Sequence, residues 1–293
     1  MSGGDTLVGW HYPGTNGACV VMAPGGGITK EPGTDRFAAR FHAEGYSVLA
    51  FDFRHLGESG GEPRQVVRIP EQLADLEAAV GYAGGLPEVD RDRLASWGFS
   101  LAGGHLFKIA ARTRGVAAVI AQSPLTDNLV AAPKALSYET PGVALAFPLI
   151  AAADAIGGLL GRPPHVIPLA GPRGTVAMLS TPDALDGARA LDPEGRYPDW
   201  QQTIAARSVL PLMIYRPARD AAKARCPMQV VICDDDTSAL AAPAHQAAAR
   251  VPDAEVVSVP GGHYAPFLDQ HEAVVAAELD FLSRRLLSGP RAR

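Results

Sequence analysis

The sequence predicts an α/β fold with a mostly parallel sheet, flanking helices and an inserted helical cap. Three observations predict it. Short apolar runs alternate with longer segments of helical period, this alternation breaks once in mid-chain, and 293 residues with 47% hydrophobic side chains can bury a large core. The apolar runs cover residues 19–23, 47–51, 93–97, 116–121, 228–233 and 255–259.

Each run is read as a strand, and the segments between the runs as crossover helices. We expect helices at about 34–44, 71–83, 101–112 and 239–250, and a closing helix at about 270–287. Glycine-rich segments follow the first predicted strand, at residues 24–28, and the third, at residues 98–104. An acidic segment, residues 234–236, follows the fifth. Because ligands of open parallel sheets bind beyond the carboxyl ends of the strands, these segments are where a site is expected.

The alternation fails between residues 123 and 208, which are rich in Ala, Pro and Gly and lack strand-like runs. This stretch is too long for a loop. We therefore predict a core domain made of residues 1–122 and 209–293, with residues 123–208 forming a mainly helical cap. Residues 142–161 are apolar over the length of a membrane span, but Pro148, Asp154 and several glycines favour a helix that lines an apolar cavity.

Composition restricts the partners and the compartment. The net charge of −5, with no basic run, gives no footprint for nucleic acid or an anionic membrane. Three scattered cysteines and an N-terminus without a signal sequence predict a cytoplasmic protein. No cofactor or metal is expected, since H-E-x-x-H and Walker motifs are absent. The sequence is compatible with a homodimer.

A serine lies at the turn that follows the 93–97 strand. The segment Gly98-Phe-Ser100-Leu-Ala102 is followed by an apolar helical pattern, so Ser100 would lie at a tight strand-to-helix turn with its hydroxyl exposed. It reads either as a nucleophile or as a helix N-cap. Residues 57–61 match G-x-S-x-G to the letter, but Gly60, Gly61 and Pro63 prevent a helix after Ser59, so Ser59 is interpreted as a loop residue.

A nucleophilic serine needs a base and an acid that orients the base. His263 follows the last strand after two glycines, whereas its rivals His55 and His105 do not lie in a late strand-end loop. The acid should follow the preceding strand, where Asp234, Asp235 and Asp236 stand in succession. Asp236 is favoured because it is the farthest from the strand, while Asp234 and Asp127 remain alternatives.

The first strand ends in Pro24-Gly25-Gly26-Gly27-Ile28. Glycines leave backbone N–H groups bare, which suits an oxyanion hole or a phosphate cradle. The oxyanion reading is preferred because the spacing G-x-G-x-x-G is absent.

The order Ser100, Asp236, His263 and the turn around Ser100 resemble the α/β-hydrolase family over nearly the whole chain. Within that superfamily, residues 51–59 look like the F-D-x-R-x-x-G-x-S loop of dienelactone-hydrolase-like and peptidase-S15-like esterases, and residues 97–105 look like their elbow. The resemblance implies that Ser100 is the nucleophile, His263 the general base and Asp236 its orienting acid, with the N–H groups of Leu101 and Gly26 as the oxyanion hole. Pro24-Gly25 departs from the usual His-Gly, and Ala102 from the usual glycine.

The sequence thus predicts a serine hydrolase that cleaves an ester or thioester through an acyl-enzyme on Ser100. The apolar cap predicts a small hydrophobic acyl substrate. The same triad could transfer the acyl group to an acceptor, as an acyltransferase or a cyclase acting on a polyketide-type thioester. A non-catalytic small-molecule-binding protein on this fold is the alternative from another class, and labelling by a fluorophosphonate would separate it from an enzyme.

Overall fold

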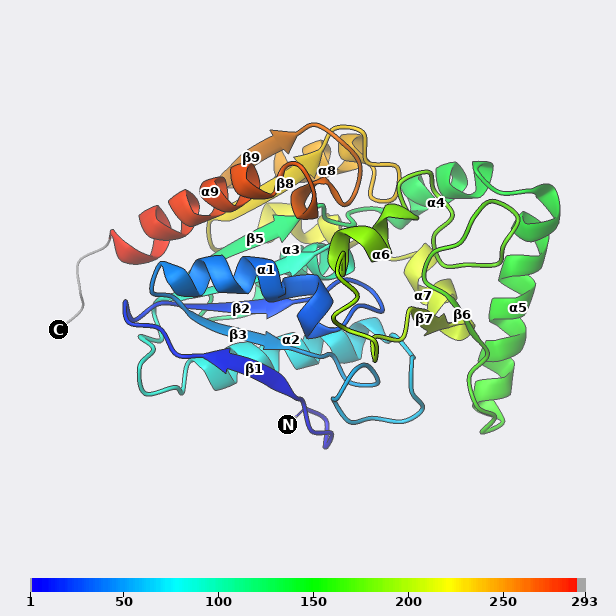
Figure 1. The fold of residues 1–293 in the computed structure, drawn as a ribbon, viewed down its shortest axis with the longest axis horizontal. Helices are drawn as coiled ribbons and strands as arrows, with labels where there is room; N and C mark the ends of the chain where they lie inside the picture. Colours follow the sequence, from blue (N-terminus) through cyan, green and yellow to red (C-terminus); the bar gives the residue numbers. More distant parts are fainter. Residues whose placement is uncertain (1, 289–293) are drawn as a thin grey trace.

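The computed structural model describes residues 2–288 and contains a seven-stranded sheet in the order β1-β3-β2-β4-β5-β8-β9 (Figure 1). The predicted strands correspond to β2 (Cys19–Ala23), β3 (Ser47–Phe51), β4 (Leu94–Phe99), β5 (Ala118–Gln122), β8 (Met228–Cys233) and β9 (Ala254–Val259). These six strands pair with one another in parallel, and this confirms the predicted α/β fold with a mostly parallel sheet. The sequence analysis missed β1 (Gly9–Tyr12), an edge strand antiparallel to β3.

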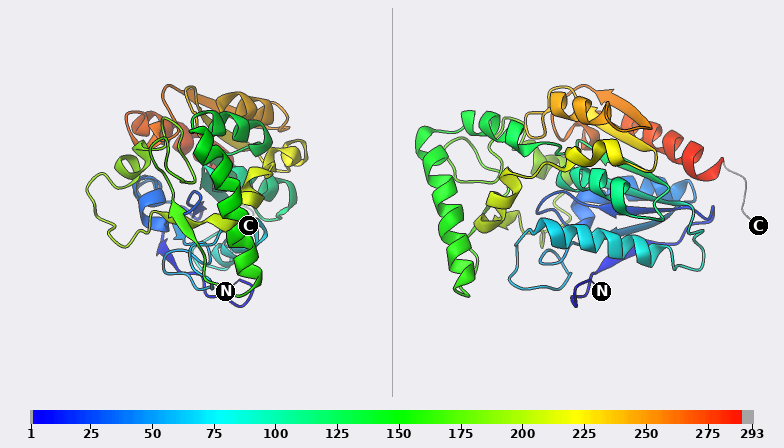
Figure 2. Two further views of the ribbon diagram at one scale, coloured as in Figure 1. Left: turned by 90° about the vertical axis from the view of Figure 1, so that its right-hand side faces the viewer. Right: turned by 180° about the vertical axis from the view of Figure 1, so that it is seen from behind.

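Two helical layers cover the sheet. Helices α1 (Lys30–Ala43) and α9 (His271–Leu282) lie on one face, and α2 (Ile69–Ala83), α3 (Leu101–Arg112) and α8 (Ala241–Ala248) lie on the other (Figures 1 and 2). Alternate strand residues supply the two cores: in β2, Cys19 and Val21 join the cluster with α2 and α3, while Val20 and Met22 join the cluster with α1 and α9.

Helix α1 begins four residues before the predicted residue 34. A proline at position 32 is tolerated in a first turn, because the N–H groups there have no intrahelical acceptor. The carboxylate of Asp52 accepts from the N–H of Lys30 at 2.8 Å and so anchors this end of the helix. At the other end of the chain, α9 stops at Leu282 and a π-helical turn (Ser283–Leu287) completes the predicted closing helix.

The segment between β5 and β8 lies beyond the carboxyl ends of the strands, on the right of Figure 1. It contains α4 (Asn128–Ser137), α5 (Pro141–Leu159), α6 (Asp186–Leu191) and a small antiparallel sheet of β6 (Val166–Pro168) and β7 (Thr203–Ala205). Helix α7 (Val209–Met213) packs on α4 and α5, so the cap continues past residue 208 to Met213. A 3₁₀ segment (Pro217–Lys223) then returns to the core against α3.

Helix α5 differs from the expected cavity-lining helix. It stands at the outer end of the cap (Figure 2), and only Ala151 and Asp154 on it are buried. Asp154 pairs with Arg207 at 2.8 Å, which holds α5 to the segment before α7. Among the described residues α5 is the one helix long and apolar enough to cross a bilayer, a weak indication on length and composition alone.

Candidate active site

Ser100 occupies a strained turn between β4 and α3. Its backbone has φ 55° and ψ −114°, a conformation that costs a non-glycine residue roughly 1–3 kcal/mol. Three backbone hydrogen bonds hold it: its N–H donates to Gln122 O, and its carbonyl accepts from the N–H groups of Gly104 and Leu125, all within 3.0 Å. The Ser100 hydroxyl oxygen accepts no N-cap hydrogen bond from the first turn of α3 and lies instead at hydrogen-bond distance from His263. The turn therefore presents a hydroxyl and does not cap the helix.

Small residues are required around this turn because the strand and helix backbones touch. A Cβ on Gly98 would lie 2.8 Å from the carbonyl carbon of Ala102, and one on Gly103 would lie 2.9 Å from Gly98 O. On Gly104 it would lie 2.2 Å from Leu125 O. Ala102 itself is buried in the core without such a requirement. The glycines that the close approach of the two backbones requires are Gly98, Gly103 and Gly104.

The three residues predicted for the triad form one hydrogen-bonded chain. His263 Nε2 lies 2.9 Å from Ser100 Oγ, and His263 Nδ1 lies 2.7 Å from Asp236 Oδ2. The serine comes from the β4 end, the aspartate from the β8 end and the histidine from the β9 end, three loops that meet because their strands are parallel. The order and distances are those of a nucleophile, a base and an orienting acid.

The structure distinguishes Asp236 from its alternatives. Asp236 is buried, and its second oxygen accepts from the N–H groups of Ser238 and Ala239, so the carboxylate is fixed on both sides. Asp234 is exposed and contributes only its backbone N–H, which donates to Val259 O. Asp127 forms a bidentate pair with Arg216. The side-chain carboxylate that pairs with the His263 ring is that of Asp236, and neither Asp234 nor Asp127 forms a hydrogen bond with His263 within residues 2–288.

The surroundings of His263 raise the pKa of its imidazole ring. Burial would lower the pKa of His263, but the charge and hydrogen bond of Asp236, together with the charge of Asp183, outweigh it and raise the pKa above 6.5. The rings of Phe99 and Tyr264 flank the imidazole, with centroids at 4.9 and 5.0 Å. A ring held in this way can take a proton from Ser100 and remain in register with Asp236.

The two residues predicted for the oxyanion hole lie against each other beside Ser100. A Cβ on Gly26 would lie 3.2 Å from Leu101 Cδ2, and one on Gly25 would lie 3.4 Å from Ser100 Cβ. Neither the Gly26 nor the Leu101 N–H donates to another backbone group between residues 2 and 288. Two N–H groups without a backbone acceptor next to the Ser100 hydroxyl have the chemistry that an oxyanion hole requires.

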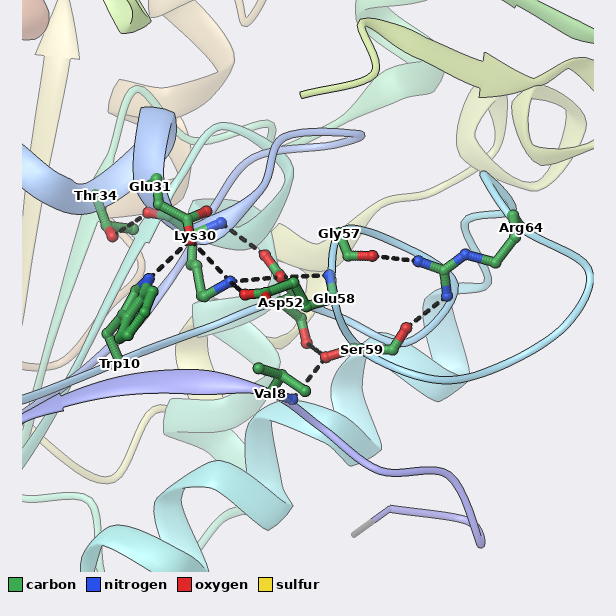
Figure 3. Close-up of polar contacts among 10 residues, drawn as sticks. All are labelled: Val8, Trp10, Lys30, Glu31, Thr34, Asp52, Gly57, Glu58, Ser59 and Arg64. Carbon is green, nitrogen blue, oxygen red and sulfur yellow. Dashed lines mark hydrogen bonds and ion pairs between the residues drawn. The ribbon is translucent and has the colours of Figure 1, made fainter. Parts of the chain in front are cut away.

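Lys30, at the start of α1 and just after the glycine loop of residues 24–28, is the centre of an ion cluster (Figure 3). The ammonium of Lys30, buried at 1% exposure, contacts Asp52 Oδ2 at 3.0 Å, Glu58 Oε2 at 2.6 Å and Glu31 Oε1 at 2.9 Å. Burial would lower the pKa of Lys30, but its carboxylate partners outweigh this and raise it. The cluster links the start of α1 to the loop after β3, which fixes the segment that carries Gly26.

Ser59, the literal G-x-S-x-G match, is a structural residue of this same region. Its hydroxyl donates to Asp52 O at 2.7 Å and accepts from the N–H of Val8 at 2.9 Å (Figure 3).

The two other candidate histidines, His55 and His105, bind groups outside the candidate triad. His55 contacts Glu71 at 2.8 Å, and buried His105 lies between Tyr215 Oη and Gln72 Oε1.

Two apolar cavities, lined by residues of the cap and of the core, lie beside the loops that carry the candidate triad. One, of about 150 Å³, borders Gly26 and Tyr264; the other, of about 100 Å³, borders Leu125 and Ser238. Met178 and Leu179 line both and so form the wall between them. A larger, polar hollow of about 500 Å³ lies past Gly27 over the Lys30 cluster, and neither Ser100 nor His263 lines it. Ser100 and His263 do not line the two apolar cavities either, but these cavities border Gly26, Tyr264 and Ser238, which lie next to the candidate triad, so they are the better candidates for an acyl group.

The sequence analysis missed Asp183, a buried carboxylate of the cap. Its Oδ2 accepts from the backbone N–H of His263 at 3.1 Å and of Thr237 at 2.9 Å. Asp183 lies in a Pro- and Ala-rich stretch with no strand or glycine signal, and its partners are 54 and 80 residues away. No local pattern could have indicated it.

The chain belongs to the alpha/beta hydrolase family, whose profile matches residues 20–277. Among curated relatives, the quorum-quenching protein AidA of Acinetobacter baumannii is 38% identical over 90% of this chain and 86% of its own length. The polyketide transferase ATR5 of Stachybotrys chlorohalonatus is 33% identical over 58% of this chain and 55% of its own length. The crystal structure of the alpha/beta hydrolase GrgF from Penicillium sp. sh18 has a TM-score of 0.78 at 24% identity, covering 97% of this chain and 95% of that one. At that identity the likeness concerns the fold.

Proposed function

We propose that this protein is a serine hydrolase that cleaves a carboxylic ester or thioester with a small hydrophobic acyl group through an acyl-enzyme on Ser100. The hydrogen-bonded chain from Ser100 Oγ through His263 to Asp236, at a strained elbow, is the observation that carries the proposal. Within the family, the resemblance of residues 51–59 and 97–105 supports a place near the dienelactone-hydrolase-like and peptidase-S15-like esterases.

In the proposed reaction His263 Nε2 takes the Ser100 proton as Oγ bonds to the acyl carbon. The carbonyl oxygen becomes negative and is bound by the N–H groups of Gly26 and Leu101. When the tetrahedral intermediate collapses, the bond to the alcohol or thiol breaks and the leaving group takes the proton from His263. Water, deprotonated by the same histidine, then attacks the acyl-enzyme and releases the acid.

The reaction is tested by trapping the nucleophile in the wild-type protein. A fluorophosphonate should add one phosphonyl group to the peptide that contains Ser100, and prior incubation with p-nitrophenyl butyrate should slow the addition because both compounds compete for the same oxygen. Intact-protein and peptide mass spectrometry measure the site and the stoichiometry. A folded protein that takes up no label, or takes it up at another residue, contradicts the enzyme reading and favours a binding protein.

The cavity volumes restrict the acyl group. About 150 and 100 Å³ are below the roughly 300–1,000 Å³ of pockets that hold drug-sized ligands. We therefore expect p-nitrophenyl esters of about two to six acyl carbons to be preferred, with kcat/KM about tenfold lower or more at twelve carbons. Met178→Ala should open a part of the dividing wall, of which Leu179 remains, and should move the preference to longer chains. Met213→Ala, which enlarges the second cavity only, is the matched control and should leave the two cavities separate.

Acyl transfer is the second candidate function, favoured by the polyketide transferase named among the relatives. The chain spans about half the length of that relative. The cap would favour transfer if it excluded water while a second cavity held the acceptor. Product analysis with and without an added alcohol decides: an acyl ester of that alcohol indicates transfer, and free acid alone indicates hydrolysis.

A cytoplasmic location and the absence of nucleic-acid and membrane partners remain predictions from composition.

A further inference from the structure

The Asp183 carboxylate lies between two loops of the candidate triad. Besides the two backbone N–H groups, it accepts from the hydroxyls of Thr237 at 2.6 Å, Ser238 at 2.8 Å and Thr181 at 2.9 Å, all on Oδ1. Thr237 and Ser238 directly follow Asp236, and the N–H on Oδ2 belongs to His263 itself. One side chain of the cap thus holds the loop of the acid and the loop of the base together.

The local structure accommodates this carboxylate. A Cβ on Gly262 would lie 2.9 Å from Asp183 Cβ, so the glycine before His263 provides the space that Asp183 occupies. Burial would raise the pKa of Asp183, but hydrogen bonds from Thr237 and the charge of His263 outweigh it and lower the pKa to about 2. The group is therefore ionised across the working pH range of an esterase. It accepts no hydrogen bond from the imidazole ring, whose Nδ1 contacts Asp236.

We propose that Asp183 is a positioning residue through which the cap sets the placement of Asp236 and His263, and that its negative charge stabilises the imidazolium formed during acyl transfer. The proposal rests on the proposed function of Ser100 and His263. It makes the cap a part of the catalytic apparatus as well as a wall of the substrate site, because the two loops of the core reach their relative position through a side chain of the insertion.

The groups that face His263 are few. Asp236 lies at Nδ1, Ser100 at Nε2, the rings of Phe99 and Tyr264 at its faces and edge, and Asp183 at its backbone N–H. Asp236 and Asp183 are the two carboxylates whose charges raise the pKa of this histidine. Removing one of the two charges should make the imidazole lose its proton at a lower pH.

Two substitutions separate charge from position. The amide of Asp183→Asn has the shape of the carboxylate, and its oxygen can accept from the two N–H groups while its NH₂ donates to the hydroxyl oxygens. With p-nitrophenyl butyrate, kcat/KM falls at low pH as His263 becomes protonated, and we call this part of the pH profile the acid limb. In Asp183→Asn the acid limb should move to lower pH by about half a unit or more, because the negative charge is lost. Asp183→Ala loses the contacts too, and should lower kcat about 10- to 100-fold with KM within about threefold.

Asp154→Asn and Asp154→Ala are the matched controls. Asp154 is also a buried cap carboxylate, and it accepts from the N–H groups of His165 and Arg207 and pairs with the Arg207 guanidinium, with no contact to the triad loops. Its loss should lower Tm without moving the acid limb. Thermal unfolding of all four variants identifies any that fail to fold, and if Asp183→Ala does so, the asparagine variant alone decides.

An acid limb that stays at the wild-type position in Asp183→Asn, or a kcat of Asp183→Ala no lower than that of Asp154→Ala, would overturn the proposal. Fluorophosphonate labelling of Ser100 in the wild type separates this failure from a failure of the proposed function. If the wild type is labelled and hydrolyses the ester, the triad stands and only the role of Asp183 falls. If the wild type is not labelled, the proposed function itself fails.

Discussion

Ser100→Ala is expected to lower kcat for p-nitrophenyl butyrate on the order of 10⁴- to 10⁶-fold, because the acyl group loses the oxygen to which it bonds. The turn is held by a backbone hydrogen bond to Gln122 O and by two from the N–H groups of Gly104 and Leu125, which alanine retains, so Tm should change little. KM should also change little, since the cavities and the two oxyanion donors stay in place. Steady-state kinetics and thermal unfolding measure these quantities.

Ser59→Ala is the control for this experiment, because Ser59 carries the literal motif. Its hydroxyl bridges Val8 and Asp52, so alanine should cost about 1 kcal/mol of unfolding free energy because the partly buried N–H of Val8 loses its acceptor and Asp52 O loses its donor. The folded fraction should keep a kcat near the wild-type value. Loss of activity in Ser59→Ala with activity retained in Ser100→Ala would reverse the assignment of the nucleophile.

Asp236→Asn is expected to lower kcat on the order of 10³- to 10⁴-fold. The carboxylate accepts from His263 Nδ1 at 2.7 Å, which leaves Nε2 without a proton and free to accept the one from Ser100. An amide whose NH₂ faces Nδ1 favours the opposite tautomer, in which Nε2 carries the proton and cannot act as a base. It also removes the charge that stabilises the imidazolium.

Asp234→Asn is the matched control, as it makes the same change two residues away in an exposed position. Its kcat should remain within about twofold of the wild type, because surface substitutions away from a site have small effects. Equal losses in the two variants would indicate that the acidic loop acts as a whole and that Asp236 has no special place. Kinetics from about pH 5 to about pH 9, which covers the range in which histidines titrate, would record both kcat and the fall of activity on the acid side.

Local patterns predicted most of the sheet. The parallel strands are buried on both faces and read as continuous apolar runs, so β2, β3 and β8 begin and end where their runs do. The edge strand β1 was missed because Trp10 and Tyr12 are exposed at 49% and 39% and give no such run. The three-residue strands β6 and β7 are too short for any periodicity to show.

The orientation of α5 could not be predicted from the pattern of apolar residues. Its residues are apolar on all sides, so the sequence contains no polar face to indicate which side meets solvent. We expected it to line a cavity, but Leu145, Leu149 and Leu159 are exposed, and Phe147 is its one residue at the cavity beside Leu125. The salt bridge of Asp154 with Arg207, 53 residues away, sets the side that faces inward.

By itself, the sequence determined the order of strands and helices and the chain order of serine, acid and histidine, because hydrophobic period and small-residue turns act over a few neighbouring residues. Only the tertiary structure decided that Asp236, among three adjacent aspartates, faces His263, and that Asp183 of the cap holds both loops. The physical reason is that these contacts join segments 27 to 80 residues apart, whose approach is set by parallel strand pairing and cap packing.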